Sequence, residues 1–564
     1  LNYNQTFYKH DIGMLLGFEE ERFVKRTTDT AKLGLIDSSV GDSSSATTPS
    51  SIGGTGEEFT SRSYFGRINY AFDSRYLFEV NMRYDGSSRF APDNRWGLFP
   101  SFSAGWRISE ERFMKGLPID NLKLRASWGK LGNNAIGNYE WQAVYNSAKY
   151  AFGGSLNNGL AITSISNNLL EWESTAITNI GIDFATLRNR LTFEAEFYNK
   201  VTDGILYRPD MYMSLGTASG PRQNIAEVTN RGIEMTLNWQ DRIGKVEYRV
   251  SGNFAYNQNK VSKYKGELQR GWVTDENGNR VYQTNIGDVS TGGSTRVIEG
   301  KMINEYYMLQ PYKGSGNGFN ADGTVNINGG PRDGMIRTVD DMKWLNAMVG
   351  AGYKFYPRQN VSKSGIWYGD YIYADLNGDG VYGNDADNEF QGCSNVPKYN
   401  FGLQASANWK GFDFSMNWSG AAGFKIYYYR LALNSSATIK GYAIGEAIAN
   451  DHYFFDPKNP NDPRTNLSSK NPRLTNNSGN DQSGMTQSSV HLQKGDYIKL
   501  KNLTIGYTLP AVLSKKVYAQ NIRFFASGEN LFTITGYEGM DPEMRTAVGY
   551  STMRQYAFGV NITF

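Results

Sequence analysis

The stretch YFGRINYAFDSRYLFEVNMRYD, residues 64–85, decides the fold. Aromatic and aliphatic side chains occupy every second position from Tyr76 to Tyr84, and Glu79, Asn81 and Arg83 stand between them. A period of two places successive side chains on opposite faces of a β-strand. The segment 64–72 alternates in the same way, and the residues 73–75 between the two are typical of a tight turn. The stretch therefore predicts two antiparallel strands with one apolar and one polar face.

The length of this alternation separates two kinds of β-sheet protein. Strands of soluble sandwiches run about five or six residues, whereas this pattern lasts about ten residues and has aromatic side chains at both ends of its apolar face, as in an outer-membrane barrel strand. About 16 such segments recur along the chain, with an uncertainty of two or so. Clear examples lie at 101–108, 122–128, 191–198, 233–239, 248–256, 401–409, 412–418 and 556–564.

Composition agrees with a barrel. The chain has 564 residues, 14% of them aromatic but only 39% hydrophobic. At about 150 residues per domain the length alone would suggest three or four soluble domains. We find no run of about 18 apolar residues that could form a membrane helix, so a membrane protein of this sequence must be a closed barrel. The predicted fold class is all-β, a transmembrane antiparallel β-barrel of which this chain supplies only part.

Charge and reactive residues exclude several functions. The 58 Lys and Arg balance 55 Asp and Glu to a net charge of +3, which gives no indication of a nucleic-acid partner. A single Cys393 allows no internal disulfide and no Cys-based zinc site. His10, His452 and His491 are the three histidines, too few for most catalytic centres, and we read them as interfacial or hydrogen-bonding groups. The chain is predicted not to be an enzyme.

The links between the predicted strands alternate in length. Short links near 7–9, 73–75, 187–189, 240–245 and 410–411 take turns with long ones at 23–61, 86–98, 131–173, 203–228, 259–398, 421–493 and 534–552. Bacterial barrels have short periplasmic turns and long extracellular loops. The Ser/Thr/Gly-rich stretch 42–57 is predicted to be a flexible external loop. Because Leu1 starts in the middle of a pattern, with no initiator Met and no signal sequence, we expect the later part of a longer polypeptide.

The most specific local motif is DLNGDGVYGNDAD at 375–387, within the long loop region 259–398. Oxygen ligands at positions one, three and five, a glycine at six and a backbone carbonyl at seven are what a calcium ion requires. Position twelve is Ala386 in place of the usual Glu, so Asp385 or Asp387 would have to complete the shell. The alternative is a turn cluster without an ion. The candidate calcium ligands are Asp375, Asn377, Asp379, Val381, Asp385 and Asp387.

Two further sets of residues are candidates for contact with cargo or with other parts of the barrel. Loop aromatics could stack on sugars or peptide groups, or pack the loops together; they are Trp272, Tyr306, Tyr307, Trp344, Tyr353, Trp367 and Tyr368. Charged residues on the polar strand faces would line the lumen and hold a plug by ion pairs or bind substrate, and we favour the plug; they are Arg67, Glu79, Arg83, Lys123, Arg125, Glu194 and Arg249.

The chain resembles the C-terminal portion of SusC/RagA-type TonB-dependent transporters of the Bacteroidetes outer membrane. The resemblance rests on segments in family order over essentially the whole chain, at 64–114, 122–133, 178–206, 230–239, 375–380, 397–418, 496–510, 529–543 and 556–564. It implies a barrel of about 22 strands with a plugged lumen, of which the present chain holds about 16. The N-terminal plug, the TonB box and the first strands would lie upstream.

The resemblance also implies partners. These are a SusD-like surface lipoprotein over the extracellular mouth, the TonB/ExbB/ExbD complex acting through the upstream region, outer-membrane lipid, and a glycan or peptide substrate. A dimer of two SusCD-like pairs is also consistent with the family. The main hypothesis is energy-coupled import of large nutrients. A passive porin-like or adhesive barrel would show the same strands, and a secreted soluble glycan-binding protein or hydrolase would be recovered without detergent. Neither the substrate nor its binding residues follow from the sequence.

Overall fold

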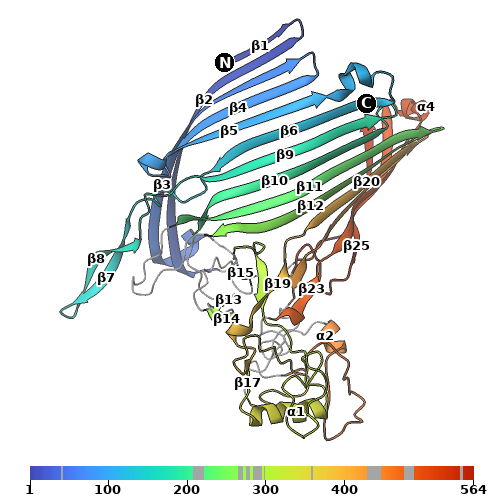
Figure 1. Ribbon diagram of the computed structural model, residues 1–564. Coiled ribbons are helices and arrows are strands. Elements are labelled where there is room, and N and C mark those ends of the chain that lie inside the picture. The colour runs from blue at the N-terminus through green and yellow to red at the C-terminus, as the bar shows by residue number, and fades with distance from the viewer. Residues whose placement is uncertain are drawn as a thin grey trace. The chain divides into compact units, whose positions relative to one another are not determined.

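The computed structural model describes residues 1–564 except 38, 40–41, 208–221, 265–270, 275–279, 284–294, 297–298, 357, 359, 429–445, 476–487 and 546–549. Its main element is a sheet of 15 strands, close to the 16 predicted, which follow one another in chain order (Figure 1). The strands are β1 (Asn2–Phe7), β2 (His10–Leu35), β3 (Ala46–Phe72), β4 (Tyr76–Ser87), β5 (Trp96–Arg107), β6 (Ile119–Asn133), β9 (Glu173–Thr186), β10 (Leu191–Tyr207), β11 (Gln223–Ile243), β12 (Val246–Tyr264), β20 (Tyr399–Trp409), β21 (Phe412–Ala422), β24 (Tyr497–Thr508), β25 (Asn521–Thr535) and β26 (Gln555–Thr563).

The links between these strands fall into two alternating series, and their lengths follow the predicted alternation for most pairs but not for 36–45, 88–95, 108–118 and 509–520, which are of similar length. Short links occupy 8–9, 73–75, 108–118, 187–190, 244–245, 410–411 and 509–520, and long links occupy 36–45, 88–95, 134–172, 208–222, 265–398, 423–496 and 536–554. Asp73 and Ser74 both have left-handed backbones, with φ of 51° and 54°, as do Lys410 and Gly411. Two consecutive left-handed residues match the right-handed twist of a hairpin, which explains why these turns can be so short.

The prediction of a flexible external loop at 42–57 is wrong for most of that stretch. β3 begins at Ala46, and β2 pairs with β3 out to the pair Leu35 and Ala46. Main-chain hydrogen bonds extend this hairpin without an apolar face, and the Thr residues at 47, 48 and 55 are good strand formers. Because its side chains are almost all exposed, the extension gives no hydrophobic alternation that sequence reading could detect.

The chain divides into two compact units. The first comprises Leu1–Leu187, Ala195–Arg231 and Ser262–Gly266, and the second Arg188–Glu194, Gly232–Val261 and Glu267–Phe564. Smaller sheets lie in the long links: β7 (Val144–Phe152) with β8 (Ser155–Ser164), β13 (Gly271–Thr274) with β14 (Arg280–Gln283), β15 (Thr295–Arg296) with β16 (Glu305–Met308) and β19 (Glu389–Ser394), β17 (Lys354–Phe355) with β18 (Val381–Tyr382), and β22 (Lys425–Tyr427) with β23 (Leu492–Lys494). The α-helices among the described residues are α1 (Val339–Gly350), α2 (Glu446–Asn450) and α4 (Ala511–Ser514).

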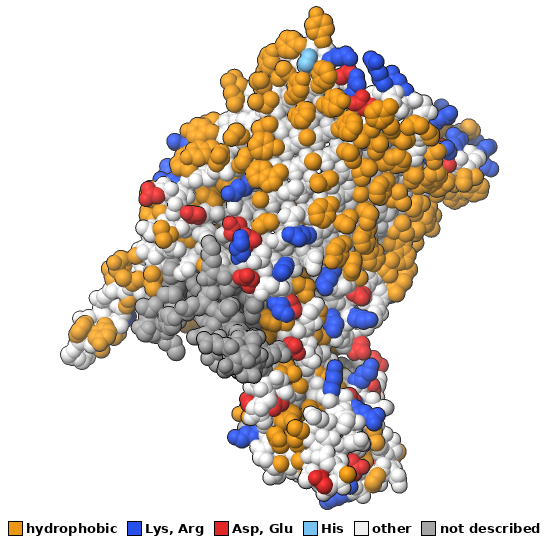
Figure 2. All heavy atoms as spheres, in the orientation of Figure 1, with side chains coloured by type: hydrophobic (Ala, Val, Ile, Leu, Met, Phe, Trp, Pro, Cys, Tyr) orange, Lys and Arg blue, Asp and Glu red, His pale blue; other side chains and the backbone are white. Residues whose placement is uncertain are grey.

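One face of the main sheet is covered by exposed hydrophobic side chains (Figure 2). In the first unit, aromatic residues border this face at both ends. Phe18 pairs with Tyr64, and eight residues further along β3 Phe72 pairs with Tyr76. At about 3.4 Å per residue the two borders lie about 27 Å apart along the strand. That length matches the apolar band of about 25 Å between the aromatic girdles of outer-membrane barrels.

Candidate functional site

The face of the sheet opposite the apolar one is polar, and strand register fixes its rows. In the first unit Asn69 pairs with Glu79, Glu79 with Ser103, Ser103 with Ser127, and Ser127 with Asn179. Directly paired residues in a sheet share a face, so these side chains form one continuous polar row across five strands. The row borders a hollow of about 570 Å³. All seven charged residues predicted for the lumen lie on strands of the sheet.

Arg125 is the centre of a charge cluster on this polar face. Its Nε donates to Asp183 Oδ1 at 3.0 Å and its Nη1 pairs with Glu196, while Lys123 Nζ lies 3.3 Å from Asp183 Oδ2. Gly181, the register partner of Arg125, leaves room for the guanidinium, because a Cβ there would stand 2.7 Å from Arg125 Cζ. The sheet therefore neutralises these charges within its own wall.

The second unit has the same arrangement. Arg523 on β25 donates from Nε to Asp413 Oδ1 at 2.8 Å and from Nη2 to Asp413 Oδ2 at 2.5 Å. Gly506 on the intervening strand β24 makes space for this pair, since a Cβ there would lie 2.4 Å from the Asp413 carboxylate. Arg249, another predicted lumen residue, donates to Gln240 at 3.1 Å. Both units thus combine a polar face with ion pairs that need no further partner.

The largest hydrophobic core lies in the long links of the second unit. We call residues 309–382 and 451–473 the loop module; Trp344, Leu345, Met348 and Phe355 are fully buried in its core. Of the predicted loop aromatics, Tyr306, Tyr307, Trp344 and Tyr368 are buried, Tyr353 and Trp367 pack partly buried against the core, and the side chain of Trp272 lies outside the described residues. These rings pack the loops together, the second of the two predicted roles.

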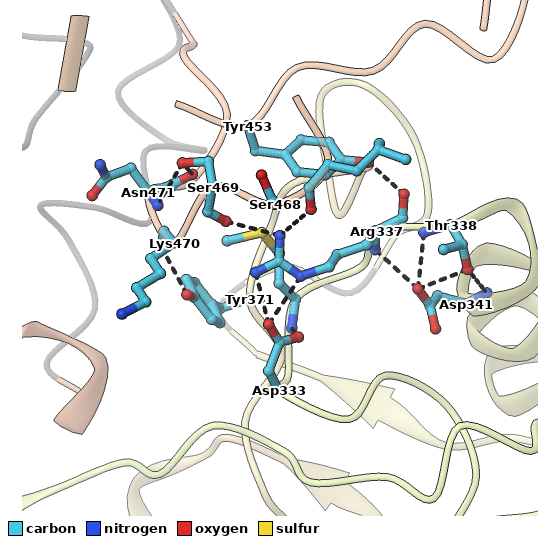
Figure 3. A network of polar contacts seen from close by, with 12 residues as sticks. Asp333, Arg337, Thr338, Asp341, Tyr371, Tyr453, Ser468, Ser469, Lys470 and Asn471 are labelled. Carbon is cyan, nitrogen blue, oxygen red and sulfur yellow. Dashed lines mark hydrogen bonds and ion pairs between the residues drawn. The ribbon is translucent and has the colours of Figure 1, made fainter. Parts of the chain in front are cut away.

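Helix α1 and the segment 451–473 meet at Arg337 (Figure 3). Thr338 and Asp341 form a capping box at the start of α1. The Arg337 guanidinium donates to the carbonyl oxygens of Leu467 at 2.6 Å and Ser469 at 2.8 Å, and pairs with Asp333 at 2.7 Å. Because Arg337 reaches main-chain oxygens more than 100 residues away, it joins two loops that are remote in sequence.

A second, more deeply buried ion pair joins the same two parts of the loop module. Arg473 donates from Nε and Nη2 to the two carboxylate oxygens of Asp370, at 2.8 and 2.9 Å. The Asp370 side chain is only 2% exposed and that of Arg473 14%. The remaining guanidinium hydrogens reach the carbonyl oxygens of Lys363 and Gly365. Sequence reading identified neither Arg337 nor Arg473, because the partners that join the two parts of the loop module lie more than 100 residues away.

The predicted calcium loop is folded around its own carboxylates. Asp375 accepts the backbone N–H groups of Gly378 and Gly380, at 2.7 and 2.9 Å. Asp379 accepts the N–H of Val381 and the side-chain amides of Asn377 and Asn384. Gly380, at position six of the motif, has φ of +79° as the sharp turn requires. The geometry of the motif is therefore that of a tight turn around acidic side chains.

Asp387 closes the loop from its far end. Its carboxylate is fully buried and accepts the N–H groups of Leu376, Gly383 and Asn384, at 2.7 to 3.1 Å. Burial raises the pKa of the Asp387 carboxyl to about 6, against the lowering effect of these hydrogen bonds. Asp385 starts the short 3₁₀ turn 385–387. Among the described residues, no group of three or more His, Cys, Asp or Glu is placed to hold a metal ion. Calcium binding here stays a prediction.

The loop 536–554 is attached to β24 through a buried lysine. Lys499 is 1% exposed and its Nζ lies 2.8 Å from both Asp541 Oδ2 and Glu543 Oε2. Burial acts to raise the pKa of Asp541 and Glu543, but the hydrogen bonds from Lys499 and its neighbours outweigh it and lower both pKa values. The two carboxylates are therefore held charged over the end of the sheet.

A sheet of long antiparallel strands, with an aromatic-bordered apolar face, a polar face of paired charges and long links that alternate with short ones, is the wall of an outer-membrane β-barrel. In the part of the chain that the structure describes, no helix is long and apolar enough to cross a membrane. Residues 2–531 match the family described as TonB dependent receptor-like, beta-barrel, and the chain belongs to this family.

Individual relatives support the same assignment. The chain is 30% identical over 601 residues to the TonB-dependent receptor P39 of Formosa agariphila, covering 100% of this chain and 52% of the relative. It is 28% identical over 517 residues to the TonB-dependent receptor SusC of Bacteroides thetaiotaomicron, covering 89% of this chain and 43% of the relative. The chain thus spans about half the length of these relatives. The family match and these relatives confirm the predicted family and the predicted location in the outer membrane.

A solved structure shows the same fold. The RagAB peptide transporter superposes with a TM-score of 0.75 at 21% sequence identity, over 100% of this chain and 54% of that chain. The curated relatives are named as TonB-dependent receptors, and the expectation that this chain is not an enzyme stays a prediction.

Proposed function

We propose that the full-length protein imports large nutrients, oligosaccharides or peptides, across the outer membrane with energy supplied through TonB. The observation that carries the proposal is the polar face of the sheet, on a chain of the TonB-dependent receptor-like β-barrel family. Placing the charged side chains of Arg125, Asp183 and Glu196 in contact with lipid hydrocarbon would cost too much free energy, so this face belongs on a lumen. Because Arg125 is paired with Asp183 and Glu196, this part of the face offers hydrogen bonds to polar cargo without a strong preference for either sign of charge.

The partners are part of the proposal. A plug and a TonB box would belong to a preceding region of the full-length protein, consistent with a chain that spans about half of its relatives. A SusD-like surface lipoprotein would close the extracellular mouth, and two such pairs would form a dimer. The name of the RagAB peptide transporter supports a peptide as cargo, and an oligosaccharide is the alternative that the test below includes.

Uptake in cells tests energy coupling. Cells with and without the gene for the full-length protein are given fluorescently labelled oligosaccharides and peptides above the porin size limit, in the presence or absence of a protonophore. We expect accumulation of one cargo class to need both the protein and the proton gradient. Accumulation that needs the protein but ignores the protonophore would identify the passive barrel instead.

Purification tests the partner. The tagged full-length protein, extracted in mild detergent, should carry a surface lipoprotein in about equal amount. A protein that is purified alone from native membranes contradicts the proposed complex, and one that stays in the supernatant after membranes are pelleted contradicts the barrel itself.

A further inference from the structure

The short link between β24 and β25 is a folded element with a fixed backbone. It consists of α4 and the following 3₁₀ turn Lys515–Val517. Ser514 is fully buried and its Oγ lies 3.3 Å from the carbonyl oxygen of Gln520. The N–H of Ala519 donates to Ser514, and that of Gln520 donates to Thr563 at the end of β26. These hydrogen bonds fix the backbone of the link, and the fixed backbone holds the side chains next to Ser514 pointing outward.

Four large apolar side chains project from this link. Val512 is 75% exposed, Leu513 48%, Val517 58% and Tyr518 92%. Single exposed apolar residues are common on protein surfaces, but four within seven consecutive positions form a patch that is normally covered. Burial of apolar surface contributes roughly 25 cal/mol per Å², so these four side chains favour binding of a partner that removes them from water.

Two lysines stand in the middle of the same segment. Lys515 and Lys516 are both exposed, and neither forms an ion pair with an acidic side chain of the described residues. Apolar side chains that flank unpaired basic ones are typical of segments that lie in the headgroup region of a bilayer. The charge complements an anionic headgroup.

The lipid-facing surface of the second unit leads directly to this link. Trp409, Phe412, Tyr507 and Phe524 are successive register partners across β20, β21, β24 and β25, close to the ends where the short links begin. Ring centroids are 6.1 Å apart between Trp409 and Phe412 and 4.5 Å between Phe412 and Tyr507. Such an aromatic border marks the edge of the hydrocarbon region, so the residues just beyond Tyr507 lie at headgroup depth.

We propose that the link 511–518 is an interfacial anchor that binds anionic phospholipid in the periplasmic leaflet. Val512, Leu513, Val517 and Tyr518 insert at the level of the glycerol and upper acyl chains, and Lys515 and Lys516 contact the headgroup phosphate. The first unit carries the same combination in its short link 108–118, where Phe113 and Leu117 are exposed on either side of Lys115. The proposal concerns lipid and does not depend on the cargo or on energy coupling.

Native mass spectrometry of the purified full-length protein tests this anchor. The protein is equilibrated in mixed micelles with equal amounts of phosphatidylglycerol and phosphatidylethanolamine, and the retained lipids are counted. The test variant is K515Q/K516Q, and the matched control is K343Q/K458Q, which removes two exposed lysines from the loop module. A basic residue at an anionic surface contributes about fivefold in affinity, so we expect a loss of up to about 25-fold in phosphatidylglycerol binding for the test variant only.

Three results would overturn the proposal: equal retention of both lipids by the wild type, retention by K515Q/K516Q equal to that of the wild type, or the same loss in the control variant. Hydrogen exchange at Leu509, whose N–H donates to Ile522, checks that the test variant keeps the folded link. A photo-crosslinker at position 518 of the protein in cells should capture lipid. Capture of a protein at that position would assign the surface to a protein partner and reject the lipid assignment.

Discussion

Replacing Arg473 by alanine should open the loop module locally. The guanidinium forms two hydrogen bonds to Asp370 at 2.8 and 2.9 Å, and the carboxylate is only 2% exposed. R473A leaves that carboxylate buried without its guanidinium partner, although the N–H of Trp367 still donates to it. Loss of one partner of a buried pair costs about 3–5 kcal/mol. At 1.36 kcal/mol per factor of ten, this corresponds to a roughly 160- to 4,700-fold increase in local opening.

Hydrogen exchange of the full-length protein in detergent measures this opening. The reporter amides are those of Tyr453 and Asn466, which bond to Asn471 and Phe454 within the same segment. R464A is the matched control, because Arg464 also pairs bidentately with an aspartate but is 71% exposed, so its loss should change exchange at most about fivefold.

A double variant separates charge from packing. D370N/R473A removes the buried negative charge as well, and we expect it to recover part of the protection lost in R473A. Exchange in R473A that stays within a few-fold of R464A, or a double variant as open as R473A, would refute the reasoning from a buried carboxylate that has lost its guanidinium.

Three further outcomes are expected. G132A should destabilise the first unit by about 1–3 kcal/mol in denaturant titrations, because its Cβ would lie 2.0 Å from the buried ring of Phe99. G53A is the control and should leave the stability unchanged, because the space around its Cβ is open. Equal effects of the two variants would contradict the packing argument. Calcium at about 5 mM, a concentration suited to loop sites of millimolar affinity, should slow hydrogen exchange in 375–387. D379A should abolish this slowing. Exchange that does not change with calcium would contradict the prediction of a calcium site. The pKa values of Asp541 and Glu543 lie below their ordinary 3.8 and 4.5, so their contribution is complete above pH 4.5 and is lost as pH falls through the lowered values. Residues 536–545 should therefore keep their protection from exchange at pH 5 and lose it only as the pH falls below the ordinary values of 3.8 and 4.5, and loss already at pH 5 would contradict this assignment.

The strands were predictable because the membrane imposes a simple pattern. Between Tyr76 and Tyr84 only alternate residues meet lipid, and the opposite face carries Glu79 and Arg83, so hydropathy reports the register directly. The pattern ends where the strand leaves the bilayer. This is why the extension of β2 and β3 to Leu35 and Ala46 was missed, since hydrogen bonds alone hold it.

The polar site was predictable only in part. Alternation assigns Arg125 and Lys123 to the polar face, but the choice of Asp183 and Glu196 as partners depends on which strands are neighbours and on their register. The loop module was even harder to predict from the sequence. Its aromatic residues indicated packing or binding equally well, and the packing found around Trp344 depends on contacts with a segment more than 100 residues further along the chain.

The pairing of Asp370 with Arg473 spans 103 residues, and the intervening chain contains the membrane strands β20 and β21. Contacts of such high contact order form late, after the chain between them has been placed. The two halves of the loop module belong to links on either side of the β20–β21 hairpin. The Asp370–Arg473 pair therefore closes a covalent loop around that hairpin, and the loop module cannot be completed until the chain through β20 and β21 has turned back on itself.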